Sequence, residues 1–455
     1  MSVEGSVRSH CDETVGKDLK MKQALLAKIS DGTATVAVIG MGYVGLPLAQ
    51  HFIAAGHRVI GVDADESRVA LLAAGKAYLK HLPMEWIAGA VNSGQFTATT
   101  DFGTLAGADA VIICVPTPLT EHREPDLSHV RDATQAAARS LRCGQLVVLE
   151  STTYPGTTEE LVLPLLAAGG LKVGEHFFLA FSPEREDPGN KKFALGEIPK
   201  VVGGISADCT EVAAALYGRV CSRIVPVSRP GAAELSKLLE NIFRSVNIAL
   251  VNELKMLCDR MGIDVWEVID AAATKPFGFM PFYPGPGLGG HCIPIDPFYL
   301  TWKAREYGFT TRFIELSGEI NTRMPEYVVS RVMDALNGQG KALRGARVLV
   351  LGAAYKADVE DMRESPALTL MALLRQKGAE VRYNDPHVPH IAHAGILLDS
   401  APLTAEELAA SDCVLIATAH SAYDPDFIVG NARLVVDTRN ITRSVAGKRD
   451  KIVRA

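Results

Sequence analysis

Short runs of β-branched and apolar residues alternate with longer stretches of helical periodicity along the first half of the chain. This pattern predicts strands that each lead into a helix, and therefore a parallel, doubly wound sheet. The first run is followed at once by a glycine-rich turn and an apolar-periodic segment, which predicts a strand–turn–helix unit. We expect strands at residues 35–39, 57–62, 110–115, 146–150, 178–181 and 200–203.

A single long helix is predicted from residue 232 to about residue 261. Its leucines, isoleucine, valine and alanines recur at helical spacing, which gives one face suited to burial. We expect helices to continue to about residue 336. An apolar helix of this kind packs within its own chain or forms a subunit interface, and the sequence leaves both open. A homodimer or a higher homo-oligomer is the expected assembly.

The alternation of strands and helices restarts after a polar, glycine-containing stretch at 338–345. Strands are predicted at 347–351, 380–384, 413–417 and 434–437, and a helix at 367–376 begins with Ser365 as N-cap and Pro366 in the first turn. The predicted fold is α/β, with two doubly wound, Rossmann-like domains joined by a long central helix. The expected parts are a flexible extension at 1–34, a nucleotide-binding domain at 35–228, a helical spine at 229–337 and a second α/β domain at 338–455.

Composition and charge narrow the class of protein. The chain has 455 residues, 48% of them hydrophobic and 22% charged, which is typical of a soluble protein with two or three domains. A formal net charge of -6 and the lack of a Lys/Arg block argue against nucleic acid as a partner. No run reaches the ~20 apolar residues of a membrane span, and residues 1–20 form no secretory signal. We therefore expect a cytoplasmic enzyme with no membrane partner.

The eight cysteines are scattered and form no C-x-x-C pair, which argues against a zinc site and against a disulfide framework. We expect reduced thiols. His387, His390 and His393 lie close together in the sequence, but no acidic residue or cysteine completes a ligand set at matching spacing. A polar loop is the favoured interpretation of these histidines, and no metal is expected.

A glycine motif lies between the first predicted strand and helix, with Gly40, Gly42 and Gly45 at the spacing G-x-G-x-x-G. The first glycine permits the turn, the second lets the backbone approach a pyrophosphate, and the third lets the helix pack on the strand. Asp63 follows where the second strand ends. Its carboxylate suits the ribose hydroxyls of NAD and repels the 2′-phosphate of NADP, so the expected cofactor is NAD.

Cys292 ends a stretch with four glycines between residues 285 and 290, and Asp296 follows four residues later. Glycine lets the backbone approach a ligand closely, and the flanking prolines limit its slack. Because a thiolate is a nucleophile, this setting indicates a reactive cysteine. A free cysteine packed in a turn is the alternative, since free cysteines are commonly buried and inert.

Further polar residues share a helix face or follow a predicted strand. Lys237 and Asn241 lie four residues apart on the long helix and project from one face, although a solvated face gives the same spacing. Glu184 follows a strand end, where ligands of open α/β sheets bind. A surface salt bridge between Glu184 and Arg185 is the alternative.

Two threonines and three cations also fall just after predicted strands. Thr117 and Thr152 either supply hydroxyl groups to a cofactor or substrate, or are ordinary turn residues. In the second α/β half, Lys356, Arg363 and Arg439 lie in or just after strand-end loops. Cations at such positions suit phosphate recognition. A dinucleotide in the first half and these cations in the second indicate a phosphorylated or nucleotide-linked substrate.

Taken together, these motifs resemble the UDP-glucose/GDP-mannose dehydrogenase family over residues 35 to about 440. The matching blocks read VIGMGYVGLP at 38–47, CVPTP at 114–118, ELSKLLEN at 234–241, GGHC at 289–292 with Asp296, RESP at 363–366 and DTRN at 437–440. The resemblance implies an NAD cofactor, a UDP-sugar substrate and a UDP-sugar-binding domain at 338–455.

The family chemistry implied by the resemblance explains the need for a thiol. C6 of the sugar is oxidised twice, and Cys292 forms first a thiohemiacetal and then a thioester, which water releases as the acid. Lys237 stabilises the oxyanion and Asn241 helps to orient it. Asp296 and Thr152 hold or activate water, and Glu184 is the general base. Implied NAD contacts are Gly40, Gly42, Tyr43, Val44, Gly45, Asp63, Arg68, Thr117, Thr152 and Arg363. Implied substrate contacts are Arg185, Lys237, Asn241, Gly289, Lys356 and Arg439.

Two stretches indicate the branch within the family: SPEREDPG at 182–189 and IPKVVGG at 198–204. Both resemble the corresponding sequences of enzymes that act on UDP-N-acetylhexosamines. Arg185, Pro188 and Ile295 depart from the UDP-glucose branch. Residues 281–298 most resemble UDP-N-acetylglucosamine 6-dehydrogenases of bacterial surface-polysaccharide pathways such as O-antigen synthesis. UDP-N-acetylmannosamine or UDP-glucose is the alternative substrate. Rivals outside this branch are a two-electron hydroxyacid dehydrogenase and a non-catalytic regulator that binds NAD or a nucleotide sugar.

Overall fold

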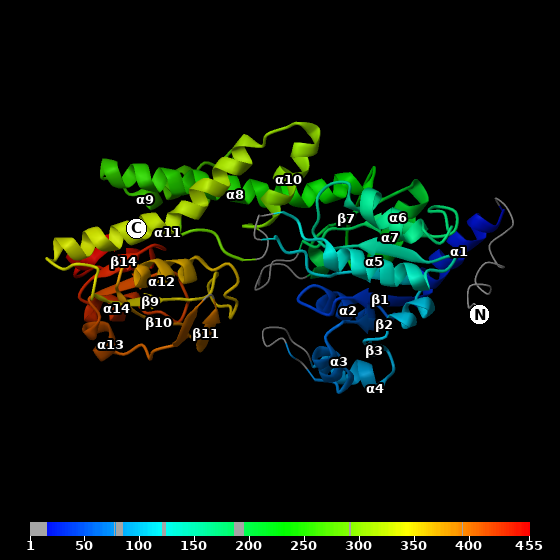
Figure 1. Cartoon of the computed structure of the whole chain (residues 1–455), viewed down its shortest axis with the longest axis horizontal. Helices are drawn as coiled ribbons and strands as arrows, with labels where there is room; N and C mark the ends of the chain where they lie inside the picture. Colours follow the sequence, from blue (N-terminus) through cyan, green and yellow to red (C-terminus); the bar gives the residue numbers. More distant parts are fainter. Residues whose placement is uncertain are drawn as a thin grey trace. The chain divides into compact units, whose positions relative to one another are not determined.

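The computed structural model describes residues 16–76, 78, 85–120, 124–185, 195–290, 293–393 and 395–455. The chain divides into two compact units, Met1–Leu239 and Glu240–Ala455. Each unit has helices packed around a β-sheet (Figure 1). The α/β class with Rossmann-like domains is therefore confirmed, while the predicted domain boundaries remain a prediction.

The first unit is built on an eight-stranded sheet with the order β3-β2-β1-β4-β5-β6-β7-β8. The described neighbours are parallel except β6 and β7, which pair antiparallel, so the expectation of a wholly parallel sheet is wrong at this point. The strands are β1 (Thr35–Ile39), β2 (Arg58–Val62), β3 (Phe96–Thr99), β4 (Ala110–Ile113), β5 (Leu146–Leu149), β6 (Phe178–Phe181), β7 (Lys200–Gly204) and β8 (Ile224–Val227).

Helices cover both faces of this sheet, because alternate residues of each buried strand face opposite sides. In β1, Val36 and Val38 belong to one hydrophobic cluster, and Ala37 and Ile39 belong to another. The helices are α1 (Gly16–Asp31), α2 (Gly45–Ala54), α3 (Glu66–Ala73), α4 (Trp86–Asn92), α5 (Ser128–Ser140), α6 (Leu163–Ala167) and α7 (Ala207–Tyr217), with short turns η2 (Phe102–Gly107), η3 (Thr158–Val162) and η4 (Leu195–Glu197).

The helix α1 replaces part of the flexible extension that the sequence led us to expect. Leu25 and Ile29 lie four residues apart on α1 and are buried in the core of the first unit. Lys22 forms ion pairs with Asp208 and Glu211 of α7, at 2.5 Å and 2.6 Å. The helix α1 is therefore held on the first unit by two buried apolar side chains and by the ion pairs of Lys22. Residues 1–15 lie outside the described part of the chain.

The long predicted helix is present as α8 (Pro230–Met261), which begins in the first unit and continues into the second. In the second unit it is followed by α9 (Val265–Ala273), α10 (Asp296–Ala304), η5 (Arg305–Tyr307) and α11 (Arg312–Gly338). Asn252 of α8 donates a hydrogen bond to Asn321 of α11 at 2.9 Å, and both side chains are buried. This polar contact fixes how the two helices lie against each other.

The second unit contains a five-stranded parallel sheet with the order β10-β9-β13-β14-β15 and a separate hairpin of β11 and β12. His390 and His393 lie on β11, so the interpretation of a polar loop is wrong for these two histidines. The remaining elements are β9 (Arg347–Leu351), α12 (Pro366–Gln376), β10 (Glu380–Asn384), β11 (His390–His393), β12 (Ile396–Asp399), α13 (Ala405–Ala410), β13 (Cys413–Ile416), α14 (Pro425–Asn431), β14 (Val435–Asp437), η6 (Ile441–Ser444), η7 (Arg449–Lys451) and β15 (Ile452–Arg454).

The cysteines correct one expectation. Cys143 is disulfide-bonded, whereas Cys114, Cys209, Cys221, Cys258 and Cys413 are free. Spacing along the sequence carries little information about which cysteines meet in space, so the bond of Cys143 left no signal in the pattern of the eight cysteines.

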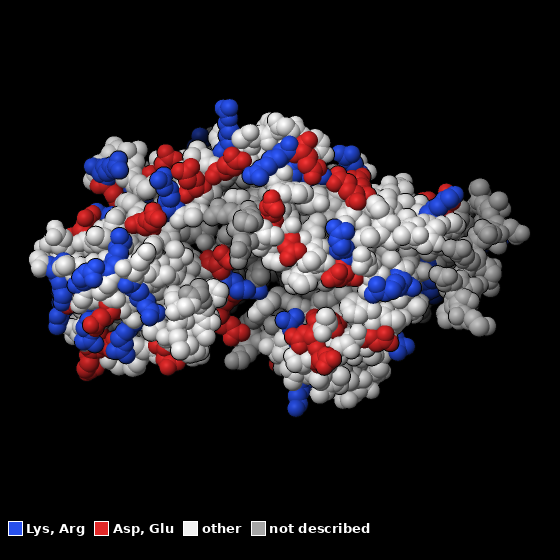
Figure 2. Space-filling model, in the orientation of Figure 1, with Lys and Arg blue, Asp and Glu red and all other residues white. Residues whose placement is uncertain are grey.

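Surface charge and helix hydropathy agree with the composition. Lys and Arg side chains are interspersed with Asp and Glu on the face shown in Figure 2, so this face offers no single-sign field for a phosphate backbone. Among the described residues, every helix falls short of the length and apolar content that a membrane crossing demands.

Candidate functional site

The glycine loop after β1 has the geometry that its motif predicts. Gly40 has φ +95, and a Cβ there would lie 2.5 Å from the carbonyl oxygen of Cys114. A Cβ at Gly45 would collide with the carbonyl oxygen of Gly40, whereas Gly42 faces open space. The loop passes Tyr43 and Val44 and ends at the N-terminus of α2. It leaves room for a pyrophosphate where backbone N–H groups and the helix dipole favour negative charge.

Asp63 lies directly after β2 and is buried beside this loop. Its Oδ2 accepts a hydrogen bond from the backbone N–H of Met41 at 2.8 Å, and its Oδ1 accepts one from Asp65 at 2.9 Å. Nη1 of Arg68 lies 3.7 Å from Oδ2 of Asp63. Each carboxylate oxygen keeps acceptor capacity, which fits the hydroxyl groups of a ribose. The structure therefore brings Asp63, Arg68 and the glycine loop together.

Thr117 and Thr152 lie along one edge of the same sheet. They follow β4 and β5, which are parallel neighbours, and β4 also pairs with β1. Both threonines are half-buried. Parallel strands end at the same sheet edge, so both residues lie on the side where the glycine loop begins.

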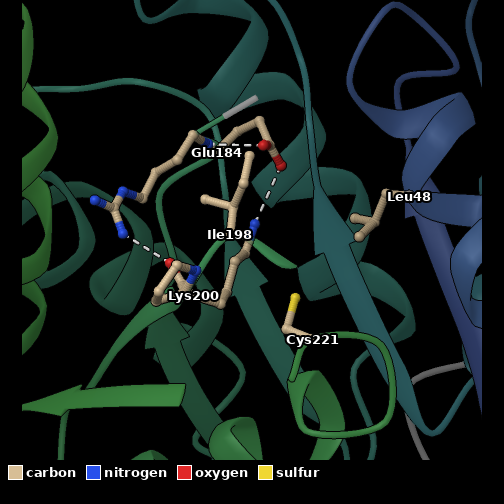
Figure 3. A pocket seen from close by; sticks show the side chains of 7 residues that line it. Leu48, Glu184, Ile198, Lys200 and Cys221 are labelled. Atoms are coloured by element: carbon tan, nitrogen blue, oxygen red, sulfur yellow. Dashed lines mark hydrogen bonds and ion pairs between the residues drawn. The ribbon is translucent and has the colours of Figure 1, made fainter. Parts of the chain in front are cut away.

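Glu184 is buried just beyond β6, and its ion-pair partner is a lysine that the sequence did not single out. Oε2 of Glu184 lies 3.1 Å from Nζ of Lys200, and Oε1 accepts a hydrogen bond from the backbone N–H of Arg185 at 2.7 Å (Figure 3). The guanidinium of Arg185 donates instead to the carbonyl oxygen of Pro199 at 2.7 Å. Because Glu184 is buried, the alternative of a salt bridge on the protein surface does not describe this carboxylate.

A second carboxylate, Glu150, contacts the same lysine from the end of β5. Nζ of Lys200 lies 3.2 Å from Oε1 of Glu150, and the hydroxyl of Tyr217 donates to that oxygen. Burial raises the pKa of Glu150, and Lys200 opposes that effect. Burial alone would lower the pKa of the Lys200 ammonium, but Glu150 and Glu184 reverse the effect and raise it. In the sequence, these three charged residues are marked only by their positions next to apolar strands: Glu150 and Glu184 follow β5 and β6, and Lys200 begins β7.

Lys237 joins this group from α8. Its side chain is buried, and Nζ donates a hydrogen bond to the backbone carbonyl oxygen of Glu184. Two of the predicted catalytic residues are therefore in contact. The adjoining pocket is lined by Leu48, Glu184, Arg185, Ile198, Pro199, Lys200 and Cys221 (Figure 3).

In the second unit the structure pairs two more predicted catalytic residues. Asn241 of α8 donates from Nδ2 to Oδ2 of Asp296, and both side chains are buried. Asp296 is the first residue of α10, so the helix N-terminus stabilises its negative charge. Oδ1 of Asn241 accepts a hydrogen bond from Arg244, which fixes the orientation of the amide.

The glycine-rich loop ending at residue 290 packs on the second α/β domain. The N–H of Gly290 donates to the carbonyl oxygen of Arg363 at 3.1 Å. A Cβ at Gly289 would lie 2.7 Å from Cβ of Tyr355, and one at Gly290 would lie 2.8 Å from its ring. Tyr355 is thus a residue of this site that the sequence did not indicate. His291 and the predicted nucleophile Cys292, like Pro188, lie outside the described residues.

The three predicted phosphate-binding cations have different surroundings. Arg439 is in contact with the glycine-rich loop at Gly285, and its Nε donates to the carbonyl oxygen of Ala417 at 2.9 Å. Burial lowers the pKa of Arg439 to about 10, and Asp437 opposes this effect. Arg363 donates from Nε to both carboxylate oxygens of Asp361, at 2.8 Å and 3.0 Å. Lys356 is half-buried in the loop after β9.

One group of side chains in the second unit has the composition of a metal site. Asp358, His387 and His420 place their possible ligand atoms within 4.8 Å of one another. However, Nδ1 of His420 accepts the N–H of Asp358 at 3.0 Å, and its Nε2 bonds Asp385 at 3.0 Å. Both ring nitrogens of His420 are already used in the protein, so we assign no metal to this group.

Comparison with known proteins places these features in a family. Models of the UDP-glucose/GDP-mannose dehydrogenase family match residues 34–221 as the NAD binding domain, 231–323 as the central domain and 349–444 as the UDP binding domain. The UDP-N-acetyl-D-glucosamine 6-dehydrogenase of Pseudomonas aeruginosa is 36% identical over 85% of this chain and 91% of its own length. The UDP-N-acetyl-D-mannosamine dehydrogenase of Methanococcus maripaludis is 35% identical over 89% and 92%.

A solved structure supports the same assignment. The UDP-D-ManNAc dehydrogenase of Pyrococcus horikoshii is 33% identical, covers 92% of this chain and 98% of its own, and has a TM-score of 0.84. The matched NAD binding domain contains the glycine loop and Asp63, so NAD as cofactor is confirmed. The chain belongs to the UDP-glucose/GDP-mannose dehydrogenase family, and it is a nucleotide-sugar dehydrogenase.

Proposed function

We propose that the chain oxidises the C6 hydroxyl of UDP-N-acetylglucosamine to the uronic acid in the cytoplasm, as a step of surface-polysaccharide synthesis. Residues 182–189, 198–204 and 281–298 support this substrate by their resemblance to the N-acetylglucosamine branch. The relative from Pseudomonas aeruginosa also supports it. UDP-N-acetylmannosamine is the alternative, because relatives that act on it match this chain almost equally well.

In the proposed reaction the protein holds the substrate carbon covalently between two oxidations. When bound, NAD supplies the hydride acceptor for both. The Cys292 thiolate adds to the aldehyde carbon to give a thiohemiacetal, and oxidation of this adduct leaves a thioester. Water then adds to the thioester carbon, the C–S bond breaks, and the thiolate leaves as the acid is released.

The buried polar residues have defined proposed roles in these steps. Lys237 stabilises the oxyanion at the substrate carbon, and Asn241 helps to orient it. Glu184 takes a proton from the attacking water, while Asp296 and Thr152 position it. Arg185, Gly289, Lys356 and Arg439 contact the UDP-sugar, and Gly40, Gly42, Tyr43, Val44, Gly45, Asp63, Arg68, Thr117, Thr152 and Arg363 contact the cofactor.

The observation that carries this proposal is the buried ammonium of Lys237, which donates a hydrogen bond to the backbone carbonyl oxygen of Glu184, next to the buried Glu184 side chain. Burying an ammonium and a carboxylate is costly, and a module that only binds a nucleotide gains little from it. The pairing of Asn241 with Asp296 adds a second buried polar contact. A catalytic protein uses such groups, whereas a non-catalytic regulator does not need them.

The test is turnover of the purified protein with each UDP-sugar and NAD. We expect two NADH per sugar with the gluco epimer only, and the uronic acid as the product detected by mass spectrometry. In Cys292→Ala, ligand binding should persist while NADH production collapses, and Cys258→Ala is the matched control. Undiminished NADH production in Cys292→Ala, or a product that stops at the aldehyde, would contradict the mechanism. Turnover of the manno epimer instead would move the substrate assignment to the alternative.

We also propose that the protein forms a homodimer through α8 and its neighbours. One stripe of α8 in the second unit leaves large apolar side chains exposed, with Leu250 at 53% and Leu257 at 51%. A contiguous apolar stripe of this kind is typical of a subunit interface. The other exposed members of this stripe are Phe243, Leu254 and Met261.

Light scattering coupled to size-exclusion chromatography tests the dimer. The double variant Leu250→Glu with Leu257→Glu should run as a monomer, because buried unpaired carboxylates oppose association. Leu397→Glu changes a still more exposed leucine, on the β11–β12 hairpin, and should leave the mass unchanged. A wild-type monomer, or a dimer that survives the double variant, would show that α8 is not the interface.

A further inference from the structure

The antiparallel pairing of β6 and β7 places Lys200 opposite Glu184. The register pairs Ala180 with Gly204 and Phe181 with Gly203. Three residues further along the same register, Glu184 faces Lys200, the first residue of β7. Had β7 run parallel to β6, Lys200 would lie at the opposite edge of the sheet. The reversal therefore serves to bring a cation to the edge where ligands bind.

Lys200 is held between two carboxylates in the interior of the first unit. Its Nζ lies 3.1 Å from Glu184 and 3.2 Å from Glu150. The Glu150 side chain is completely buried, and the Tyr217 hydroxyl donates to it from α7. Burying a charge is costly unless it is paired. The Glu150 carboxylate is not exposed to solvent, so its ion pair with Lys200 fixes the position of the ammonium group.

The two carboxylates differ in what they can reach. Glu184 and Lys200 both line the pocket of the first unit, whereas Glu150 does not. The carboxylate of Glu184 accepts hydrogen bonds from the ammonium of Lys200 and from the N–H of Arg185. The order of contacts thus runs from the buried Glu150, through Lys200, to Glu184 at the pocket. Figure 3 shows the last of these contacts, between Lys200 and Glu184.

We propose that Lys200 is a positioning residue for the general base. Anchored by Glu150, its ammonium group fixes the orientation of the Glu184 carboxylate and keeps it ionised. The inference rests on the proposed function, because it assigns to Glu184 the proton transfer from water during thioester hydrolysis. It adds a cation and an anchoring acid to the set of residues on which that step depends.

The ionisable groups around Glu184 come from several elements. Lys200 of β7 and Lys237 of α8 are the cations, and Arg185 contributes its backbone N–H. Glu150 after β5 and Tyr217 of α7 interact with the same lysine or with its partner. The thiols of Cys114 and Cys221 complete the surroundings, and burial raises the pKa of both. Lys200 is in direct contact with the Glu184 carboxylate, with its Nζ 3.1 Å from Oε2.

The test compares Lys200→Met and Lys200→Arg in the full chain, with UDP-sugar and NAD. Removing an opposite charge at this distance raises the pKa of a carboxyl by about 1–3 units, so the acid limb of the kcat profile should move up by that amount in Lys200→Met. Lys200→Arg should return the limb to within about half a unit of wild type. Lys172→Met removes an exposed lysine of the same unit and should leave the limb in place.

Pre-steady-state kinetics separate this role from a general loss of structure. Lys200→Met should keep its initial burst of NADH but then turn over at least about tenfold more slowly. The acylated enzyme should accumulate and be visible by mass spectrometry of quenched samples. A distorted fold would lower the burst as well. Should the single variant fail to fold, Lys200→Met with Glu150→Gln removes the unpaired buried acid, and the same burst and pH shift are expected from it.

The outcomes distinguish this inference from the proposed function. If wild type turns over a UDP-sugar but Lys200→Met keeps its acid limb and accumulates no acylated enzyme, Lys200 does not act on Glu184 and the proposed function stands. If wild type oxidises no UDP-sugar, the proposed function fails, and the inference fails with it. A burst with a shifted limb that Lys200→Arg restores supports the inference.

Discussion

The buried carboxyl of Glu234 allows a prediction that follows directly from the geometry. Glu234 lies near the start of α8 and accepts hydrogen bonds from the N–H of Gly156 at 2.6 Å, the N–H of Thr158 at 2.9 Å and the hydroxyl of Thr158 at 2.7 Å. These bonds hold the turn that follows Thr152. Burial nevertheless raises the pKa of Glu234 from 4.5 to about 7, because the three bonds only partly offset the loss of water.

The sign and size of the pH effect follow from this shift. A carboxyl with a raised folded pKa holds its proton more tightly in the folded state, so its full stabilising contribution is present below the unfolded value of 4.5. As the pH rises to about 7, the unfolded state loses the proton first and stability falls. At about 1.4 kcal/mol per pH unit, the loss amounts to roughly 3 kcal/mol. Glu234→Gln carries no titrating proton and should lack this loss.

The assay follows thermal unfolding of wild type, Glu234→Gln and Glu253→Gln between about pH 5 and about pH 8. Glu253 is exposed on the same helix, so its variant should follow wild type. Amide exchange at Gly156 and Thr158 should report the effect locally, with protection falling in wild type as the pH rises. If the stability of Glu234→Gln and wild type changed in parallel over this range, the reasoning from burial would be refuted.

Three further predictions test individual positions. Gly290→Ala should slow turnover at least about tenfold, because the added methyl group displaces the glycine-rich loop that ends at residue 290. Gly278→Ala is the control, since Gly278 also has a positive φ but faces open space, and its steady-state turnover should match wild type. Asp63→Asn should weaken NAD binding about tenfold and bring the affinity for NADP closer to that for NAD, as measured by calorimetry. Unchanged affinities would show that Asp63 does not contact the cofactor. Arg439→Met should weaken UDP binding about tenfold or more by the same method, and equal binding would exclude a phosphate contact.

Much of the fold was predictable from the sequence because the apolar runs carry the periodicity of their own elements. The runs at 35–39, 178–181 and 380–384 match β1, β6 and β10, and the long helix matches α8. The strands that escaped prediction are short. The segment 96–99 has only one buried residue, and 224–227 contains a proline and is half exposed at the sheet edge.

The site residues that belong to a local sequence motif were predictable. Those that reach the site only through strand pairing or contacts distant in sequence were not. Gly40, Gly45 and Asp63 follow from a fixed spacing between a strand and a helix. Lys200 does not, because nothing local to it shows that β7 is antiparallel and so turns its first residue toward Glu184. Tyr355 contacts the loop at 289–290 across a long sequence separation, and no spacing rule encodes such a contact.

The two Rossmann-like units use the same carboxylate position in opposite ways. Asp63 follows β2 and accepts backbone hydrogen bonds from Met41 and Asp65. Asp385, at the corresponding position after β10, accepts N–H groups of the loop after β9 and of its own turn, and also bonds the buried His420. Four backbone donors and an imidazole fill the acceptor sites of one carboxylate. Because that carboxylate is saturated, the described residues of the second unit offer no equivalent ribose acceptor at this position, whereas Asp63 of the first unit keeps acceptor capacity.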